Sequence, residues 1–204
     1  MNKALLLKKD KTGLVVAAEI LKQGGIGVFP SDTLYGIFAS ALVPEAVERV
    51  YRLRGRDRHK PMIVALASVK ELSLFGIKLI PRTTKFLRAV WPGQVSVVLA
   101  CSLSKFKYLH RGTKTLAFRI PRDGFFRDLL RLTGPLVVPS ANSAGLTPAF
   151  NVAQARRYFG EKSDFYLEAG KLVGLTSTVV QFGKSGQVKI LRQGTVKPKK
   201  AWFS

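Results

Sequence analysis

The chain has 204 residues, which suits a single domain, and 47% of them are hydrophobic, enough for a buried core. Glycine and proline occur at ordinary levels and no apolar run approaches the ~18–20 residues of a membrane span. Disordered, collagen-like and membrane-spanning classes are therefore excluded. The single cysteine, Cys101, excludes an internal disulfide framework and a multi-cysteine zinc site. With no signal-peptide core in the first ten residues, we expect a cytoplasmic protein.

The net charge is the unusual number in the composition. Lys and Arg total 34 against 12 Asp and Glu, which gives +22 at pH 7. Because self-repulsion disfavours a compact chain, this charge indicates a polyanionic partner or substrate, such as nucleic acid or nucleotide phosphates. A source whose proteins are generally basic is the alternative interpretation.

Apolar spacing predicts the elements in chain order. A first helix can be capped by Thr12 and ends at Gly24-Gly25, and a buried strand follows at 26–30. Pro44 opens a second helix. Further strands are predicted at 62–67, 95–100, 115–120, 136–139, 177–182 and 188–192, and further helices at 68–75, 85–90, 125–132 and 151–160.

These elements predict the fold class. Strands and helices interleave, but several strands follow one another directly. This order favours one α/β domain over 1–204, with a twisted mixed parallel and antiparallel sheet flanked by helices. We expect a basic tail at about 197–204.

Two segments after predicted elements carry polar or charged clusters. The turn 30–36 (PSDTLYG) is either an ordinary cap or a holder of a small polar ligand. The segment 51–61 (YRLRGRDRHKP) crowds arginines around Gly55, which interrupts the helix. It is either a solvated face or a phosphate-binding loop, because guanidinium groups bind phosphate oxygens bidentately. It is not a P-loop, since no GxxxxGK[ST] occurs.

Further polar residues stand inside or at the ends of predicted strands. In the strand 115–120, Ala117 and Arg119 share one side, so Arg119 needs a partner, which is either a ligand carboxylate or an internal acid. The turn 91–96 (WPGQVS) is typical of a rigid corner. The loop 139–145 (PSANSAG) contains hydroxyls without a GxSxG motif, and the two histidines lie in no triad context, which disfavours a serine hydrolase.

Taken in order, these segments resemble the YrdC/TsaC family of L-threonylcarbamoyladenylate synthases, in its short single-domain form. Seven collinear segments carry the resemblance: 30–36, 54–61, 91–96, 116–121, 139–145, 177–180 and 191–194. It implies a YrdC-like fold with a basic concave face. It also implies an ATP-dependent nucleotidyltransferase that makes L-threonylcarbamoyl-AMP and pyrophosphate from L-threonine, bicarbonate and ATP.

The resemblance further implies partners and residue roles. Separate transfer enzymes would pass the threonylcarbamoyl group to the adenosine beside the anticodon of tRNA. Mg²⁺ would be carried on the ATP phosphates, without a metal site in the protein. The catalytic residues implied are Arg56, Lys60 and Arg119. The threonine pocket would contain Thr33, Arg119, Ser140 and Ser177. ATP would contact Arg54, Arg56, Lys60, Thr115, Asn142 and Arg192.

Several positions depart from the family pattern. Asp32 stands in place of a usual Glu, and Arg54 in place of a Lys. Ala65 stands where some relatives have a threonine-contacting His, and Ser143 begins a shifted loop. Gln94 replaces a proline of the tryptophan corner. These changes bear on threonine and ATP affinity, and no general base is indicated.

Two other functions compete with this interpretation. The net charge also fits a non-catalytic module that uses the same fold to bind tRNA or structured ribosomal RNA. The second competing function is that of a carbamoyl-phosphate-handling relative of the hydrogenase maturation proteins. It is disfavoured because those proteins carry additional domains and zinc-finger cysteines, which this chain lacks.

Overall fold

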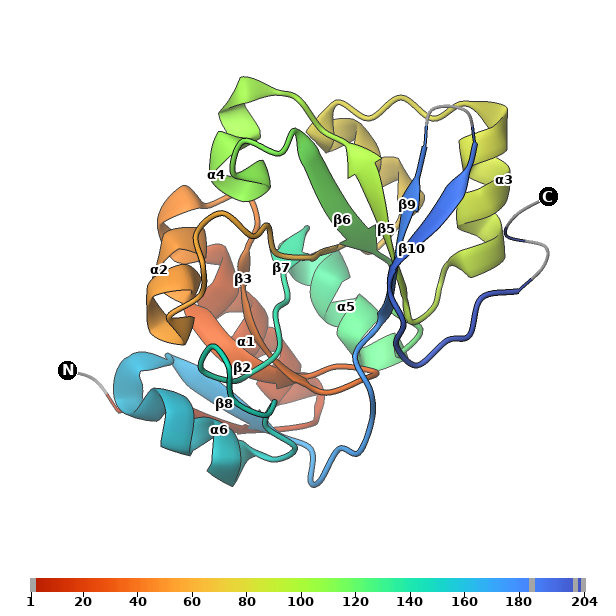
Figure 1. The fold of residues 1–204 in the computed structure, drawn as a ribbon. Coiled ribbons are helices and arrows are strands. Elements are labelled where there is room, and N and C mark those ends of the chain that lie inside the picture. Colours follow the sequence, from red (N-terminus) through yellow and green to blue (C-terminus); the bar gives the residue numbers. More distant parts are fainter. Residues whose placement is uncertain (1–2, 184–185, 200–201, 203–204) are drawn as a thin grey trace.

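The structure is a computed structural model that describes residues 3–183, 186–199 and 202 (Figure 1). Its strands are β1 (Leu5–Lys8), β2 (Ile26–Pro30), β3 (Tyr35–Ser40), β4 (Val64–Ala65), β5 (Val95–Ala100), β6 (Thr115–Arg119), β7 (Leu136–Val137), β8 (Phe165–Glu168), β9 (Thr178–Phe182) and β10 (Val188–Arg192). Its helices are α1 (Lys11–Lys22), α2 (Pro44–Arg54), α3 (Pro81–Val90), α4 (Lys107–His110), α5 (Gly124–Thr133) and α6 (Val152–Phe159). The 3₁₀ turns are η1 (Val69–Phe75), η2 (Ser104–Phe106) and η3 (Gly160–Lys162).

All these strands form one mixed sheet in the order β1-β8-β2-β3-β7-β4-β6-β5-β9-β10. The pairs β1/β8, β2/β8, β4/β6 and β5/β9 are parallel, and β2/β3, β3/β7, β4/β7, β5/β6 and β9/β10 are antiparallel. The predicted single α/β domain with a twisted mixed sheet is therefore confirmed.

Two hydrophobic clusters hold the helices to the sheet. In one, α1 and α5 pack Leu21 and Leu129 against Phe29 and Phe38 of β2 and β3. The other, larger cluster contains the apolar faces of α2, α3 and α6. Because the helices surround the sheet in this way, the polar turns between strands are left to form a surface cavity. No helix in the described ranges has the length and apolar character needed to cross a bilayer.

The structure differs from the predicted elements in several places. Asp10, and not Thr12, caps α1, since its side chain accepts a 2.8 Å hydrogen bond from the Gly13 amide. Strands β1, β3 and β8 were not predicted, and the strand expected at 62–67 is reduced to β4. Helix α3 starts at Pro81 instead of residue 85.

The C-terminal segment is only partly described. Residues 200, 201, 203 and 204 of the predicted basic tail lie outside the described residues, as do 184 and 185 of the final hairpin turn. Trp202 packs edge to face on Phe86 of α3, with ring centroids 6.4 Å apart. The described part of the tail is thus anchored to the helix beside the hairpin.

Candidate functional site

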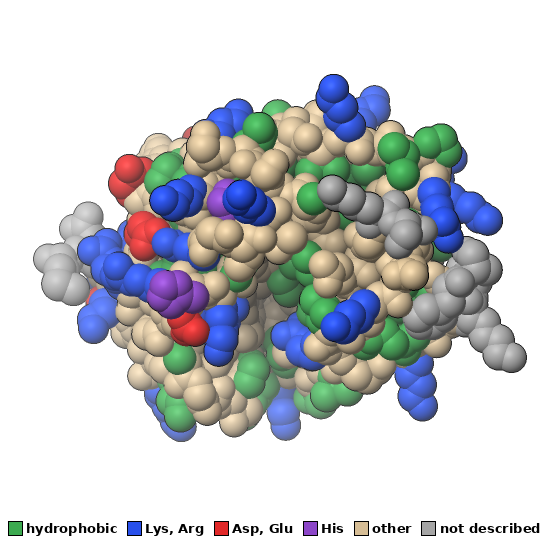
Figure 2. Space-filling view, turned by 45° about the horizontal axis from the view of Figure 1, so that its top comes forward, with side chains coloured by type: hydrophobic (Ala, Val, Ile, Leu, Met, Phe, Trp, Pro, Cys, Tyr) green, Lys and Arg blue, Asp and Glu red, His purple; other side chains and the backbone are tan. Residues whose placement is uncertain are grey.

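A cavity of about 350 Å³ opens where the turns after β2, α2 and β7 meet β6 and β9. Figure 2 shows the surface hollowed there, with Lys and Arg side chains on both rims. Four arginines line the cavity: Arg54, Arg56, Arg119 and Arg192. Hydroxyl side chains also line it, including Ser31, Thr33, Thr113, Thr115, Ser140 and Ser177.

The turn after β2 presents Thr33 to the cavity. The Ser31 hydroxyl accepts hydrogen bonds from the Thr33 and Leu34 amides at 3.2 and 3.1 Å, and donates to the Leu34 carbonyl at 2.6 Å. It also lies 2.9 Å from the Thr33 hydroxyl. A serine that closes a turn on its own backbone fixes the residues inside it. The short polar side chains of this segment are therefore what sets the position of Thr33.

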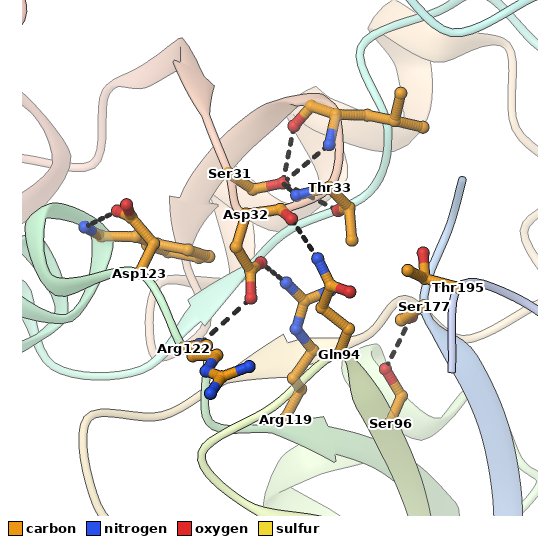
Figure 3. Close-up of polar contacts among 12 residues, drawn as sticks. Ser31, Asp32, Thr33, Gln94, Ser96, Arg119, Arg122, Asp123, Ser177 and Thr195 are labelled. Carbon is orange, nitrogen blue, oxygen red and sulfur yellow. Dashed lines mark hydrogen bonds and ion pairs between the residues drawn. The ribbon is translucent and has the colours of Figure 1, made fainter. Parts of the chain in front are cut away.

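Arg119 is almost fully buried in the cavity wall and forms an ion pair with Asp32 (Figure 3). The Asp32 carboxylate also accepts a hydrogen bond from the Arg122 amide at 3.1 Å, and the Asp32 carbonyl accepts one from the Gln94 side chain. Burial, together with the charge of Arg192, lowers the pKa of Arg119 to about 10, so the guanidinium remains charged at neutral pH. Of the two partners considered for Arg119, the structure shows the internal acid.

Arg54 is the second buried arginine of the wall. Its Nε donates to the Asn142 carbonyl and one Nη donates to the Asn142 side-chain oxygen, each at 3.0 Å. The other Nη has no hydrogen-bond partner among the described residues. Burial and the neighbouring charge of Arg56 lower the pKa of Arg54 to about 10. A buried cation with an unpaired N–H at a cavity is suited to bind an anion.

The loop after α2 carries two predicted phosphate-binding residues, Arg56 and Lys60, and only Arg56 lines the cavity. Arg56 lines the cavity and donates to the Lys60 and Pro61 carbonyls at 3.2 and 3.1 Å. The Lys60 side chain is 72% exposed, and its ammonium group lies 3.6 Å from an Asp57 carboxylate oxygen. Lys60 is therefore not part of the cavity lining, in contrast to its expected place beside the phosphates.

Asn142 is likewise absent from the lining, although it contacts residues that belong to it. Its side-chain oxygen accepts from the Ser140 hydroxyl at 2.7 Å as well as from Arg54, and its amide donates to the Ser143 and Leu146 carbonyls at 2.8 Å. With every polar atom of the side chain used inside the protein, Asn142 positions Arg54 and Ser140 and does not face the cavity itself.

Ser177 is held at the start of β9 by two side chains from other strands. Its hydroxyl lies 2.9 Å from the hydroxyl of Ser96 on β5, and both residues are buried (Figure 3). Arg192 of β10 donates to the Ser177 carbonyl at 2.8 Å and to its hydroxyl at 3.3 Å. Burial first, and then the charge of Arg56, lowers the pKa of Arg192. This arrangement places a hydroxyl and a guanidinium side by side.

Sequence analysis singled out most of the cavity residues, but not all of them. Eight of the ten predicted site residues line the cavity: Thr33, Arg54, Arg56, Thr115, Arg119, Ser140, Ser177 and Arg192. The lining residue Thr113 was not among them, and neither was Ser96, which lies outside the lining and contacts Ser177. A signal for Ser96 existed, because it shares a strand face with Val98, which pairs with Ala117 beside Arg119.

The chemistry open to this cavity is that of positioning and anion binding. His59 is exposed on the loop after α2, and the buried His110 accepts a hydrogen bond from the Gly112 amide at 3.2 Å. Neither lines the cavity, so no serine there has a histidine base. Within the described residues, no group of three or more His, Cys, Asp or Glu could hold a metal ion. The arginines and hydroxyls of the lining fit an anionic ligand such as a phosphate group.

Comparisons with known proteins identify the relatives of this chain. The family model Sua5_yciO_yrdC, described as "Telomere recombination", matches residues 19–194. A putative threonylcarbamoyl-AMP synthase of Mycobacterium tuberculosis is 31% identical over 184 residues, which is 90% of this chain and 85% of the relative. The threonylcarbamoyl-AMP synthase of Halorhodospira halophila is 33% identical over 83% of this chain and 90% of its own.

Solved structures show the same fold. Pyrococcus abyssi Sua5, crystallised with L-threonine, superposes with a TM-score of 0.85 at 25% identity over 95% of this chain, which spans 58% of the Sua5 chain. Escherichia coli YciO superposes with a TM-score of 0.83 at 20% identity, over 97% of this chain and 98% of its own. The chain belongs to the Sua5/YciO/YrdC family, as a homologue of the threonylcarbamoyl-AMP synthases.

Proposed function

We propose that this protein makes L-threonylcarbamoyl-AMP and pyrophosphate from L-threonine, bicarbonate and ATP. The observation that carries the proposal is the cavity lined by four arginines, in which Arg54 keeps a buried, unpaired N–H. Small hydroxyl side chains line the same space, as a small polar amino acid requires. The names of the relatives, and the threonine complex of one of them, support the choice of substrates.

The reaction requires no covalent bond to the protein. The threonine amine and bicarbonate give a carbamate and water. A carbamate oxygen then attacks the α-phosphorus of ATP, and the bond from that phosphorus to the bridging oxygen breaks, so pyrophosphate leaves with the electron pair. The carbamate readily loses carbon dioxide, and water hydrolyses the product, which is a mixed anhydride of the carbamate and AMP. Holding the reactants in line and excluding solvent are therefore the main contributions we expect from the cavity.

The arginines have the role of binding phosphates in this proposal. Arg54, Arg56 and Arg192 would hold the triphosphate and stabilise the charge that grows on departing pyrophosphate. Mg²⁺ bound to the phosphates would withdraw electrons from phosphorus and screen their charge. Lys60 would join them only if its loop moves toward the cavity. Thr115, which lines the cavity, would contact the nucleotide.

Hydroxyls and one ion pair would hold threonine. Thr33, Ser140 and Ser177 offer hydroxyls from three separate segments of the lining. Arg119 faces the same space, and its Nε has no hydrogen-bond partner among the described residues. In the proposal this N–H meets the threonine carboxylate, while Asp32 keeps the guanidinium in place.

The product then leaves for tRNA. Separate transfer enzymes would place the threonylcarbamoyl group on the adenosine beside the anticodon, in the cytoplasm. The competing function, a non-catalytic RNA-binding module, accounts for the net charge. It gives no reason to bury Arg54 beside an open cavity or to pair the hydroxyls of Ser96 and Ser177.

Pyrophosphate release tests the proposal. Nucleic-acid-free protein is given Mg-ATP, L-threonine and bicarbonate, and each is omitted in turn. Release that requires both threonine and bicarbonate supports the synthase. Folded protein that releases no pyrophosphate with all three present contradicts it and favours the RNA-binding alternative.

A further inference from the structure

The loop that follows α2, residues 55–61 (GRDRHKP), borders the cavity at both of its ends. Arg56 near its start and Pro61 at its end line the cavity, and residues 57–60 between them are exposed. In the proposed function, phosphate groups in the cavity would lie against this loop. The contacts that the cations of the loop already make therefore bear on how a phosphate group binds.

Both cations that are predicted to bind phosphate on this loop contact oxygen atoms of the loop itself. Arg56 donates to the carbonyls of Lys60 and Pro61 at 3.2 and 3.1 Å. The Lys60 ammonium group lies 3.6 Å from a carboxylate oxygen of Asp57. The loop thus supplies the oxygen atoms that a phosphate group has to replace before it can bind these two cations.

Asp57 carries the one charged group among these oxygen atoms. Its carboxylate accepts a hydrogen bond from the His59 amide at 2.9 Å, and its carbonyl accepts one from the Lys60 amide at 3.2 Å. The hydrogen bond from His59 and, beyond it, the charge of Lys60 lower the pKa of Asp57, so the carboxylate is ionised at neutral pH. The turn therefore holds a full negative charge beside the Lys60 ammonium group.

The turn itself does not require this charge. Asn or Ser can close the same kind of turn, because an amide or hydroxyl oxygen accepts the same hydrogen bond from the backbone. What the aspartate adds is its negative charge, and between Glu48 and Glu71 it is the one acid among seven Lys or Arg. Because the ion pair is made with Lys60, the charge acts first on that ammonium group.

We infer that Asp57 is a positioning residue that competes with the phosphate groups of the substrate for Lys60. This inference rests on the proposed function, in which ATP supplies those phosphates. The ion pair keeps Lys60 outside the cavity lining, so a triphosphate recruits Lys60 only by breaking the pair. An exposed pair is weak, so a triphosphate with several charges displaces the single carboxylate. The same competition favours release of pyrophosphate, because Asp57 takes Lys60 back as the product leaves.

The variant Asp57→Asn tests this competition, because its amide oxygen can still accept from the His59 amide while the charge is lost. Binding of Mg-ATP to the full chain is measured by calorimetry. We expect the Kd to fall about two- to fivefold, the range that an exposed ion pair accounts for. The KM for ATP in pyrophosphate release should fall with it while kcat does not rise, a division that a merely structural role would not produce.

Asp128→Asn on α5 is the matched control. It makes the same change of net charge in another exposed pair, with Arg131 three residues further along, and neither residue lines the cavity. The Kd for Mg-ATP should therefore stay unchanged in this variant. An equal gain in affinity in both variants would overturn the inference, because ATP would then respond to net charge alone.

A second substitution locates the effect at Lys60. In a Lys60→Met background, Asp57→Asn should leave the Kd for Mg-ATP unchanged, since no ammonium group remains to compete for. With Lys60 present, the gain should shrink near 1 M salt, where the screening length is about 3 Å. The same gain in both backgrounds, a gain that salt does not alter, or no gain at all would each overturn the inference.

Two precautions keep the outcomes distinct. If Asp57→Asn lowers the unfolding midpoint, Asp57→Ser replaces it, since a hydroxyl can also close the turn. Binding of Mg-ATP is measured without threonine or bicarbonate. Protein that binds ATP as expected but releases no pyrophosphate with all substrates present contradicts the proposed function alone. Protein that releases pyrophosphate but whose ATP affinity does not depend on Asp57 contradicts this inference alone.

Discussion

Two parts of the cavity wall differ in whether their arginines are paired with an acid. At the turn after β2, Arg119 is paired with Asp32, whose carboxylate and carbonyl accept further hydrogen bonds from Arg122 and Gln94. At the end of α2, Arg54 and Arg56 bond only to neutral oxygens, and no acid joins them among the described ion pairs. The first region is organised without a ligand, whereas the second keeps positive charge for one. Substitutions in the second region should therefore reduce mainly activity, and those in the first should reduce mainly stability.

The largest effect is expected at the end of α2, where Arg54 and Arg56 have no acid partner among the described ion pairs. Arg54→Ala removes the buried donor that the proposal assigns to the phosphates and should reduce pyrophosphate release about 10²–10³-fold, as loss of one such electrostatic donor does elsewhere. The control is Arg49→Ala on the same helix, which removes an arginine that pairs with Asp164 away from the cavity. Steady-state rates of both variants, with unfolding midpoints, are the measurement. Equal activity losses in the two would contradict the role given to Arg54.

At the turn after β2, where Arg119 is paired with Asp32, substitution should reduce mainly the stability of the protein. Asp32→Ala leaves the buried Arg119 without its acid and should lower the free energy of unfolding by about 3–5 kcal/mol. In the double variant Asp32→Ala, Arg119→Leu no buried charge remains, so its loss should be smaller than the sum of the single losses. Urea unfolding of all four proteins checks this. Strict additivity would show that the ion pair does not couple the two segments.

A smaller effect is expected where Ser96 holds Ser177. Ser96→Ala should raise the KM for threonine several-fold with little change in kcat, since one buried hydrogen bond contributes about 1 kcal/mol. Ser163→Ala is the control, because it removes a buried hydroxyl bonded to the Phe165 carbonyl and outside the cavity lining. A similar rise in KM for both would leave Ser96 with a merely structural role.

The smallest effect is expected at Gln94, which replaces a proline of the family pattern. Gln94→Ala removes the hydrogen bond to the Asp32 carbonyl but leaves the ion pair between Asp32 and Arg119. The KM for threonine should therefore rise about two- to threefold, as expected for the loss of one partly buried hydrogen bond. Gln94→Glu replaces the donor with a charged acceptor and should be worse than Ala. Initial rates over a range of threonine concentrations distinguish them, and a Glu variant equal to the unmodified protein would contradict the contact.

Local patterns predicted much of the fold and of the cavity. Strand alternation placed Arg119 on the side of Ala117, and both line the cavity. The resemblance to the family implied that Thr33, Ser140 and Ser177 lie together although they stand more than 30 residues apart, and all three line the cavity, each next to a strand of the same sheet. Pro44 at the first turn of α2 and Gly55 at its left-handed end also follow from local chemistry.

Long-range partners and short strands escaped prediction. The pairing of Arg119 with Asp32 depends on how β6 lies beside the turn after β2, which no local spacing encodes. Strands β1 and β8 are short, and they pair with each other across some 160 residues. Lys60 and Asn142 share motifs with cavity residues, yet their side chains are engaged by Asp57 and by Arg54. Which member of a motif faces a cavity is decided by such neighbours.

Product identification tests the central claim most directly. The protein is incubated with ATP, L-threonine and ¹³C-labelled bicarbonate, and small molecules are analysed by mass spectrometry. We predict an adenylate that contains threonine and gains the label, strongly reduced with Arg54→Ala and formed at near-normal levels with Arg49→Ala. Pyrophosphate without a labelled threonine adenylate, or no adenylate from the folded protein, would contradict the account.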